Sequence, residues 1–224
     1  MTGFERWLCD AHGRPRKLRF GIVLAAYYVL FSVTYLPINL FSVGRNAHIL
    51  FLPGEEQLPF LPIFEYLYVL TYFIPFLLIV TIRDYARFRH TVRAFIATLL
   101  TAYATYLALP VWFERPQLEV TSLHTWLLSI EYLDKSYNNF PSLHVAMSWL
   151  AVHASQVSRK SRLGLAALAT AISVSTLFVK QHYMVDVLYG GALAWWAWRL
   201  TASRRATAKV LMLRVGRKTT EKQQ

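Results

Sequence analysis

Six long apolar segments follow one another along the chain, and polar or basic stretches separate them. An α-helix needs about 20 apolar residues to cross the hydrocarbon core of a bilayer, and most of the segments are close to that length. The pattern therefore predicts an all-α polytopic membrane protein, built as a six-transmembrane-helix bundle. The predicted helices cover residues 20–41, 62–82, 94–112, 141–159, 163–181 and 183–198.

The first apolar segment, residues 20–41, directly follows a polar stretch that ends in closely spaced basic residues. A cleaved signal peptide is the alternative interpretation. It is weaker, because the apolar region exceeds the usual length of roughly 7–15 residues and no small-x-small cleavage site follows it. We therefore expect a retained helix. Without an internal repeat or linker, the chain 1–224 is predicted to be one membrane domain with a basic tail 1–19, a core 20–198 and a basic tail 199–224.

Composition agrees with a membrane protein and narrows the chemistry. The chain has 55% hydrophobic and 16% charged residues, which is too apolar for an ordinary soluble domain. Its single cysteine, Cys9, excludes an internal disulfide and a metal knuckle of paired cysteines. No cofactor is expected.

The distribution of charge predicts the orientation of the helices. If all six segments cross the membrane, one side carries 20 of the 24 Lys and Arg residues. Basic residues accumulate on the cytoplasmic side, so both termini are predicted to be cytoplasmic. The net charge of +12 is then a consequence of topology and of contacts with anionic lipid, and it does not indicate a nucleic-acid partner.

Polar residues suited to phosphate chemistry are predicted at the outer ends of the helices. Arg115 follows the third segment, His144 opens the fourth, and His182 and Asp186 lie near the turn between the fifth and sixth. In the six-helix arrangement all of them reach the same membrane surface. Ionisable residues close to a membrane interior are costly and commonly functional, so we interpret the group as a site.

Three sequence motifs around these residues carry a resemblance to a known family. ERP at 114–116, PSLH at 141–144 and S-x6-H-x3-D at 175–186 resemble, in their order, the three-part signature of the type 2 phosphatidic acid phosphatase superfamily. The resemblance covers most of the chain after about residue 50 and implies a membrane enzyme that transfers phosphoryl groups without a metal. FPSLHVA, KQHYMVD and GEEQLPFLP look more like the branch that contains inositol phosphorylceramide synthases.

The resemblance assigns roles to three of these residues. It makes His182 the nucleophile, which forms a phosphohistidine. Asp186, four residues further on, can accept the proton of the other ring nitrogen and so fix the tautomer that attacks. His144 would protonate the departing lipid oxygen and then deprotonate the incoming water or alcohol.

Phosphate-binding residues are expected beside the histidines. Arg115 is the main anchor, since its guanidinium can bind two oxygens at once, and Ser142 with the amides that open the fourth helix adds an anion site. Lys180 is a further candidate cation. The sequence departs from the family at two positions: Ala108 is found where a lysine is expected, and Thr176 where an arginine is expected. Two phosphate cations are missing, which favours the branch that uses acceptors other than water.

The expected function is that of a lipid phosphatase or phosphotransferase acting on a lipid phosphate or diphosphate. A headgroup transferase of the inositol phosphorylceramide synthase type is the alternative, because hydrolysis and transfer differ only in whether water or a hydroxyl enters second. A non-catalytic lipid transporter or binding protein is a third possibility. The expected partners are the lipid substrate and membrane lipids, in a bacterial inner membrane with the site facing the periplasm.

A zinc site is the remaining alternative for the histidine motifs. His182 and Asp186 have the spacing of helical metal ligands, and His144 could be a third ligand. Arg115 and Lys180 argue against it, because neighbouring cations suit a bound anion and repel a metal ion.

Overall fold

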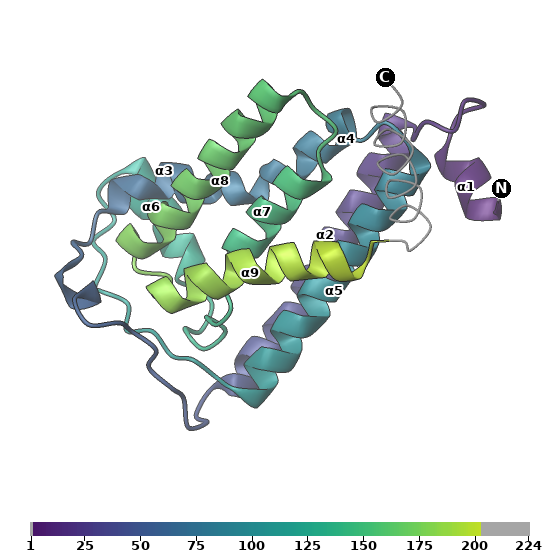
Figure 1. Ribbon diagram of the computed structural model, residues 1–224. Helices are drawn as coiled ribbons and strands as arrows, with labels where there is room; N and C mark the ends of the chain where they lie inside the picture. Colours follow the sequence, from purple (N-terminus) through teal and green to yellow (C-terminus); the bar gives the residue numbers. More distant parts are fainter. Residues whose placement is uncertain (1, 203–224) are drawn as a thin grey trace, which may run out of the picture.

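The computed structural model describes residues 2–202, and within this range the chain is helical (Figure 1). Most of the basic tail predicted at 199–224 lies outside the described residues. Several elements are single turns of α- or 3₁₀-helix (η). In chain order the elements are α1 (Gly3–Leu8), α2 (Lys17–Ser42), η1 (Glu55–Gln57), η2 (Pro62–Phe64), α3 (Glu65–Tyr68), η3 (Val69–Tyr72), η4 (Ile74–Phe76), α4 (Leu77–Thr81), α5 (Tyr85–Ala108), α6 (Leu123–Glu131), α7 (Leu143–Ala154), α8 (Arg159–Phe178) and α9 (Met184–Leu200).

Four helical stretches within residues 2–202 are long and apolar enough to cross a membrane: 17–42, 62–81, 85–108 and 159–178. They correspond to the first, second, third and fifth predicted segments. The remaining two segments form shorter helices, α7 with 12 residues and α9 with 17. The all-helical, membrane-type fold is confirmed, whereas the count of six crossings and the orientation of the termini stay predictions.

Two helices begin earlier than expected because polar side chains cap them inside the basic turns. The helix α5 begins at Tyr85 rather than near residue 94, since the Asp84 carboxylate accepts a hydrogen bond from Arg87 N at 2.8 Å. The helix α8 begins at Arg159 rather than near residue 163, because Ser158 Oγ accepts from Ser161 N at 3.2 Å. A hydropathy pattern marks apolar stretches and does not reveal such caps.

The second predicted helix is not continuous. Between residues 62 and 81 the chain alternates α-helical and 3₁₀ turns, and Pro62 and Pro75 each open a 3₁₀ turn. Proline has no backbone N–H and disfavours an uninterrupted α-helix, so the segment winds irregularly. This winding places Thr71 against α7, where its hydroxyl donates to His144 O at 3.1 Å.

The helix α7 lies at the centre of the bundle and packs against α5, α8 and α9, while α2 packs along α5 (Figure 1). The helix α9 crosses α7 closely at Gly190. A Cβ at that position would lie 2.6 Å from Ser142 O, so only glycine permits the approach. The first turns of α7 and α9 are thereby held together.

Two short helices were not predicted. The helix α1 lies in the N-terminal tail, and α6 lies in the polar stretch 113–140, where a capping box between Ser122 and Thr125 starts it. Just beyond α6, Tyr132 OH donates to Val179 O at 3.0 Å. The end of α6 is therefore tied to the turn that follows α8, which carries His182.

Candidate active site

The two motif histidines lie side by side. His144 is in the first turn of α7, His182 precedes α9, and Asp186 is in the first turn of α9. His144 Nδ1 is 3.2 Å from His182 Nε2, and His182 Nδ1 is 3.4 Å from Asp186 Oδ2. The three side chains thus form one continuous line of polar contacts, in which Asp186 can hold a proton on Nδ1 and leave His182 Nε2 with a lone pair.

Backbone hydrogen bonds hold this line in place. Ser142 N donates to Asp186 O at 3.1 Å, and Tyr183 N donates to Asp186 Oδ2 at 2.8 Å. At the end of α8, Lys180 adopts a left-handed conformation with φ of 55°, and Gln181 N donates back to Thr176 O at 3.0 Å. This tight reversal directs His182 toward α7.

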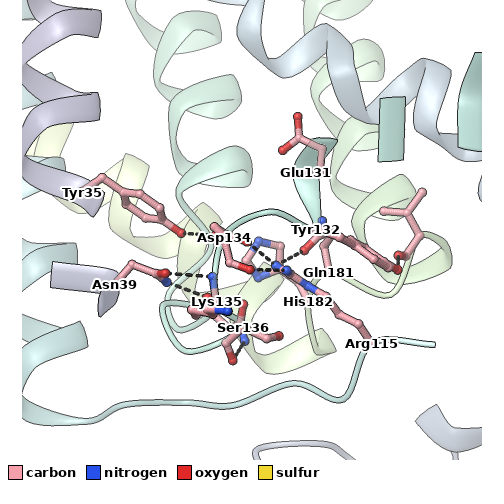
Figure 2. Close-up of polar contacts among 12 residues, drawn as sticks. Tyr35, Asn39, Arg115, Glu131, Tyr132, Asp134, Lys135, Ser136, Gln181 and His182 are labelled. Atoms are coloured by element: carbon pink, nitrogen blue, oxygen red, sulfur yellow. Dashed lines mark hydrogen bonds and ion pairs between the residues drawn. The ribbon is translucent and has the colours of Figure 1, made fainter. Parts of the chain in front are cut away.

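Arg115 lies in the same cluster (Figure 2). Its Nη2 donates to Asp134 Oδ1 at 2.7 Å and to Gln181 Oε1 at 2.9 Å, and its guanidinium carbon lies 4.8 Å from the centroid of the Tyr132 ring. Two side-chain nitrogens close by, Arg115 Nε and Asn138 Nδ2, are buried and have no hydrogen-bond partner among the described residues. Unpaired buried donors are costly, so these two are suited to an anionic ligand.

A cavity of about 450 Å³ opens in front of the histidines, and we call it the tyrosine-lined cavity. His144, His182 and Arg115 form its polar end. Side chains from α2, α5, α6, α7, the 62–81 segment and the 133–139 loop form most of the remaining wall. Its aromatic members are Tyr27, Tyr28, Phe31, Tyr35, Tyr68, Tyr72, Phe95 and Tyr106. An apolar chamber that ends in a cation and two imidazoles suits a molecule with an apolar body and an anionic head.

A second cavity of about 600 Å³, the loop cavity, lies between the 49–60 and 112–117 loops. The residues that line both cavities are Arg115 and His182. These two side chains therefore stand at the boundary between the apolar chamber and the loops.

Burial controls the charge of the nucleophile candidate. His182 is 5% exposed, and this burial, together with the Arg115 guanidinium, lowers its pKa to about 3. The imidazole is therefore neutral across the physiological range, as a nucleophilic nitrogen must be. Burial also raises the pKa of Glu131, at the end of α6.

The other two predicted phosphate ligands are placed differently. Ser142 is fully buried and caps α7 by accepting from Val145 N at 3.4 Å, and it does not line either cavity. Lys180 lines the loop cavity only, and its Nζ donates to Leu58 O at 2.7 Å. The structure thus brings together His144, His182, Asp186 and Arg115, and the phosphate-binding roles of Ser142 and Lys180 stay predictions.

Sequence reasoning missed three residues at this site. Tyr68 OH lies 2.8 Å and Tyr72 OH 3.2 Å from His144 Nε2, and Tyr72 OH lies 2.6 Å from Glu131 Oε2. A signal for the tyrosines was present, because Glu65, Tyr68 and Tyr72 recur at helical spacing in an otherwise apolar segment. Glu131 had no comparable signal.

The geometry also bears on the zinc alternative. His144, His182 and Asp186 follow one another in a line, rather than surrounding a common point. Within residues 2–202, no group of three or more His, Cys, Asp or Glu side chains is arranged to hold a metal ion.

Comparisons with known proteins support the motif resemblance at the level of the superfamily. Searches of curated proteins and of solved structures give no match. A family model described as the PAP2 superfamily matches residues 46–200, a range that includes α3 to α9 and the four clustered site residues. The chain therefore belongs to the PAP2, or type 2 phosphatidic acid phosphatase, superfamily.

Proposed function

We propose that the protein is an integral membrane enzyme that removes or transfers the phosphate of a lipid phosphate or diphosphate through a phosphohistidine. Membership in the PAP2 superfamily supports a phosphatase or phosphotransferase type of activity in general. The observation that carries the specific proposal is the line from Asp186 through His182 to His144 at the polar end of an apolar cavity.

In the proposed first step, His182 Nε2 attacks phosphorus. Asp186 accepts a hydrogen bond from the Nδ1–H of His182 and stabilises the positive charge that develops on the ring as the N–P bond forms. Arg115 balances the charge on the phosphate oxygens, with Asp134 and Gln181 fixing the plane of its guanidinium. A ligand that pairs with Arg115 Nε and Asn138 Nδ2 would satisfy both buried donors.

His144 is positioned for the proton transfers. Its Nδ1 faces His182 Nε2, so an oxygen that leaves phosphorus opposite that nitrogen departs into the space beside His144. The same position serves the entering oxygen in the second step, because displacement on the phosphohistidine must also occur opposite the N–P bond. The lipid that donates the phosphoryl group and the water or alcohol that accepts it would thus occupy the same polar site in turn. The lipid chain would lie in the tyrosine-lined cavity.

The test is phosphate release from dispersed lipid phosphates by the detergent-solubilised protein in the presence of a chelator. We expect release by the wild type and none by His182→Ala. His90→Ala is the matched control, because His90 is on α5 and contacts Trp198 O, remote from the motif histidines. Release that persists in His182→Ala would remove this residue as the nucleophile.

Transfer to an alcohol is the second candidate function. Transfer is favoured by two uncharged residues at positions where the family has phosphate-binding cations. Ala108 is the last residue of α5, and the buried hydroxyl of Thr176 donates to Ser173 O at 2.8 Å. With fewer fixed cations, water would be less strongly held near the phosphate. Supplying a phospholipid donor with myo-inositol or a ceramide should then give a new phospholipid or phosphosphingolipid, and a product limited to free phosphate would exclude transfer to these acceptors.

The site is further proposed to face the exterior of a bacterial inner membrane. The support is the charge asymmetry of the sequence, since 20 of the 24 basic residues fall on the side opposite the motifs if all six segments cross. A membrane-impermeant reagent added to intact cells should label a cysteine placed in the loop 113–121 and should not label a cysteine placed at the exposed position of Arg83 in the basic turn.

A further inference from the structure

His144 has an unusual set of neighbours for a residue that must give up a proton. Its Nε2 lies 2.8 Å from Tyr68 OH and 3.2 Å from Tyr72 OH, and its Nδ1 faces His182. Among the described residues, no carboxylate forms an ion pair with His144. A partly buried imidazolium without a counterion is costly, so the resting ring is expected to be neutral.

A neutral imidazole cannot act as an acid by itself. If His144 gives its Nδ1 proton to the departing lipid oxygen, the ring becomes an imidazolate unless another proton reaches Nε2 at the same time. That proton must come from the groups that contact Nε2, which are the two tyrosine hydroxyls. A tyrosine can pass a proton on only if it receives one from a further donor.

Only one of the two tyrosines has such a donor within residues 2–202. Tyr72 OH donates to Glu131 Oε2 at 2.6 Å, and a protonated Glu131 carboxyl group can reverse this hydrogen bond and donate to Tyr72. The Tyr68 hydroxyl contacts His144 and no carboxyl group. Glu65 lies nearby in sequence, but its carboxyl oxygens are buried without a hydrogen-bond partner among the described residues. The contacts therefore single out one path, from Glu131 through Tyr72 to His144.

We propose that Glu131 and Tyr72 form a proton relay that supplies His144 during departure of the lipid alcohol. In the first step the Glu131 carboxyl gives its proton to Tyr72, Tyr72 gives its own to His144 Nε2, and His144 Nδ1 gives its proton to the leaving oxygen as the P–O bond breaks. Glu131 ends as a carboxylate. In the second step the incoming water or alcohol gives a proton to His144 Nδ1, and the Nε2 proton returns through Tyr72 to Glu131.

Two features of Glu131 fit this role. Burial raises the pKa of its carboxyl group, which favours the protonated form that the relay needs at the start. The residue is only partly buried and lines the tyrosine-lined cavity, so it can also exchange protons with water. In Figure 2 its carboxyl group points away from Asp134 and Gln181, which leaves the Arg115 cluster separate from the relay.

This inference rests on the proposed function, and its test compares leaving groups. A relay matters when a strongly basic alkoxide departs and matters little when the departing oxygen is weakly basic. We would measure alcohol release in a single turnover with enzyme in excess, using dodecyl phosphate and p-nitrophenyl phosphate. Glu131→Gln and Tyr72→Phe should each slow dodecanol release about 100-fold and change nitrophenol release by less than about threefold.

Tyr35→Phe is the matched control. Tyr35 lines the same cavity and its hydroxyl also donates to an acid, Asp134 at 2.9 Å, but it does not contact His144. It should change release of the two alcohols by one common factor. If Glu131→Gln and Tyr72→Phe also slow both substrates equally, or slow neither, the relay is wrong. If the wild type releases neither alcohol, or if His182→Ala still releases them, the proposed function itself fails.

Discussion

The glycine pair at 190 and 191 offers a sharp test of how the candidate active site is held together. A Cβ at position 190 would lie 2.6 Å from Ser142 O and 3.1 Å from Val145 Cβ, whereas a Cβ at Gly191 would meet nothing within 4 Å. To restore an ordinary 3.4 Å contact, α9 must move from α7 by roughly 0.8 Å, the difference between 3.4 and 2.6 Å. That shift would break the 3.1 Å hydrogen bond from Ser142 N to Asp186 O.

The energetic consequences of the two substitutions have opposite signs. Replacing glycine by alanine inside a helix stabilises it by roughly 0.5–1 kcal/mol, and both variants share this gain. Gly190→Ala also suffers overpacking, which costs about 1–3 kcal/mol, and the lost hydrogen bond costs about 1 kcal/mol. The free energies of unfolding should therefore differ by roughly 2–4 kcal/mol between the variants, with Gly191→Ala the more stable.

The assay is thermal unfolding of the two variants in the same detergent, together with phosphate release. A difference of 2–4 kcal/mol corresponds to roughly 4–16 °C in Tm for a chain of this size. Gly190→Ala should also lose activity at temperatures where it is folded, because Asp186 and His182 move with α9. Equal Tm values, or a Gly190→Ala enzyme with wild-type activity, would refute the packing inferred for α7 and α9.

Three further outcomes are expected at the site. Arg115→Lys removes the planar contacts to Asp134 and Gln181, so kcat/KM for phosphate release should fall about 100-fold, and a loss below threefold would exclude Arg115 as the main anchor. Asp186→Asn replaces the carboxyl group that contacts His182 Nδ1 and should lower kcat about 10- to 100-fold with KM little changed in steady-state assays. His182 has a pKa of about 3 when folded and of 6.5 as a free imidazole, so its protonation favours unfolding. The stabilisation from the neutral His182 is complete above pH 6.5 and is lost as pH falls toward 3. Between neutral pH and pH 5, the free energy of unfolding of the wild type should therefore fall by about 2 kcal/mol more than that of His182→Gln, as measured by denaturant unfolding.

Local sequence features predicted where the helices lie more accurately than they predicted the first and last residue of each helix. Segments 20–41 and 62–82 could be located because their apolar residues are contiguous, and the structure has helical stretches there at 17–42 and 62–81. The fourth segment was predicted to extend to residue 159, but α7 ends at Ala154. No proline or glycine marks that end in the sequence, so the boundary depends on packing rather than on local propensity.

The sequence by itself determined the class of the protein and pointed to His144 and His182 as candidate site residues, because hydropathy and the motifs around these histidines are local properties of the chain. Only the tertiary structure decided which groups lie beside those histidines. The partners of Arg115, and the path from Glu131 through Tyr72, depend on where α6, the 62–81 segment and α7 meet. Such contacts join residues separated by 19 to 72 positions, and only the close packing of the helices brings them within hydrogen-bonding distance.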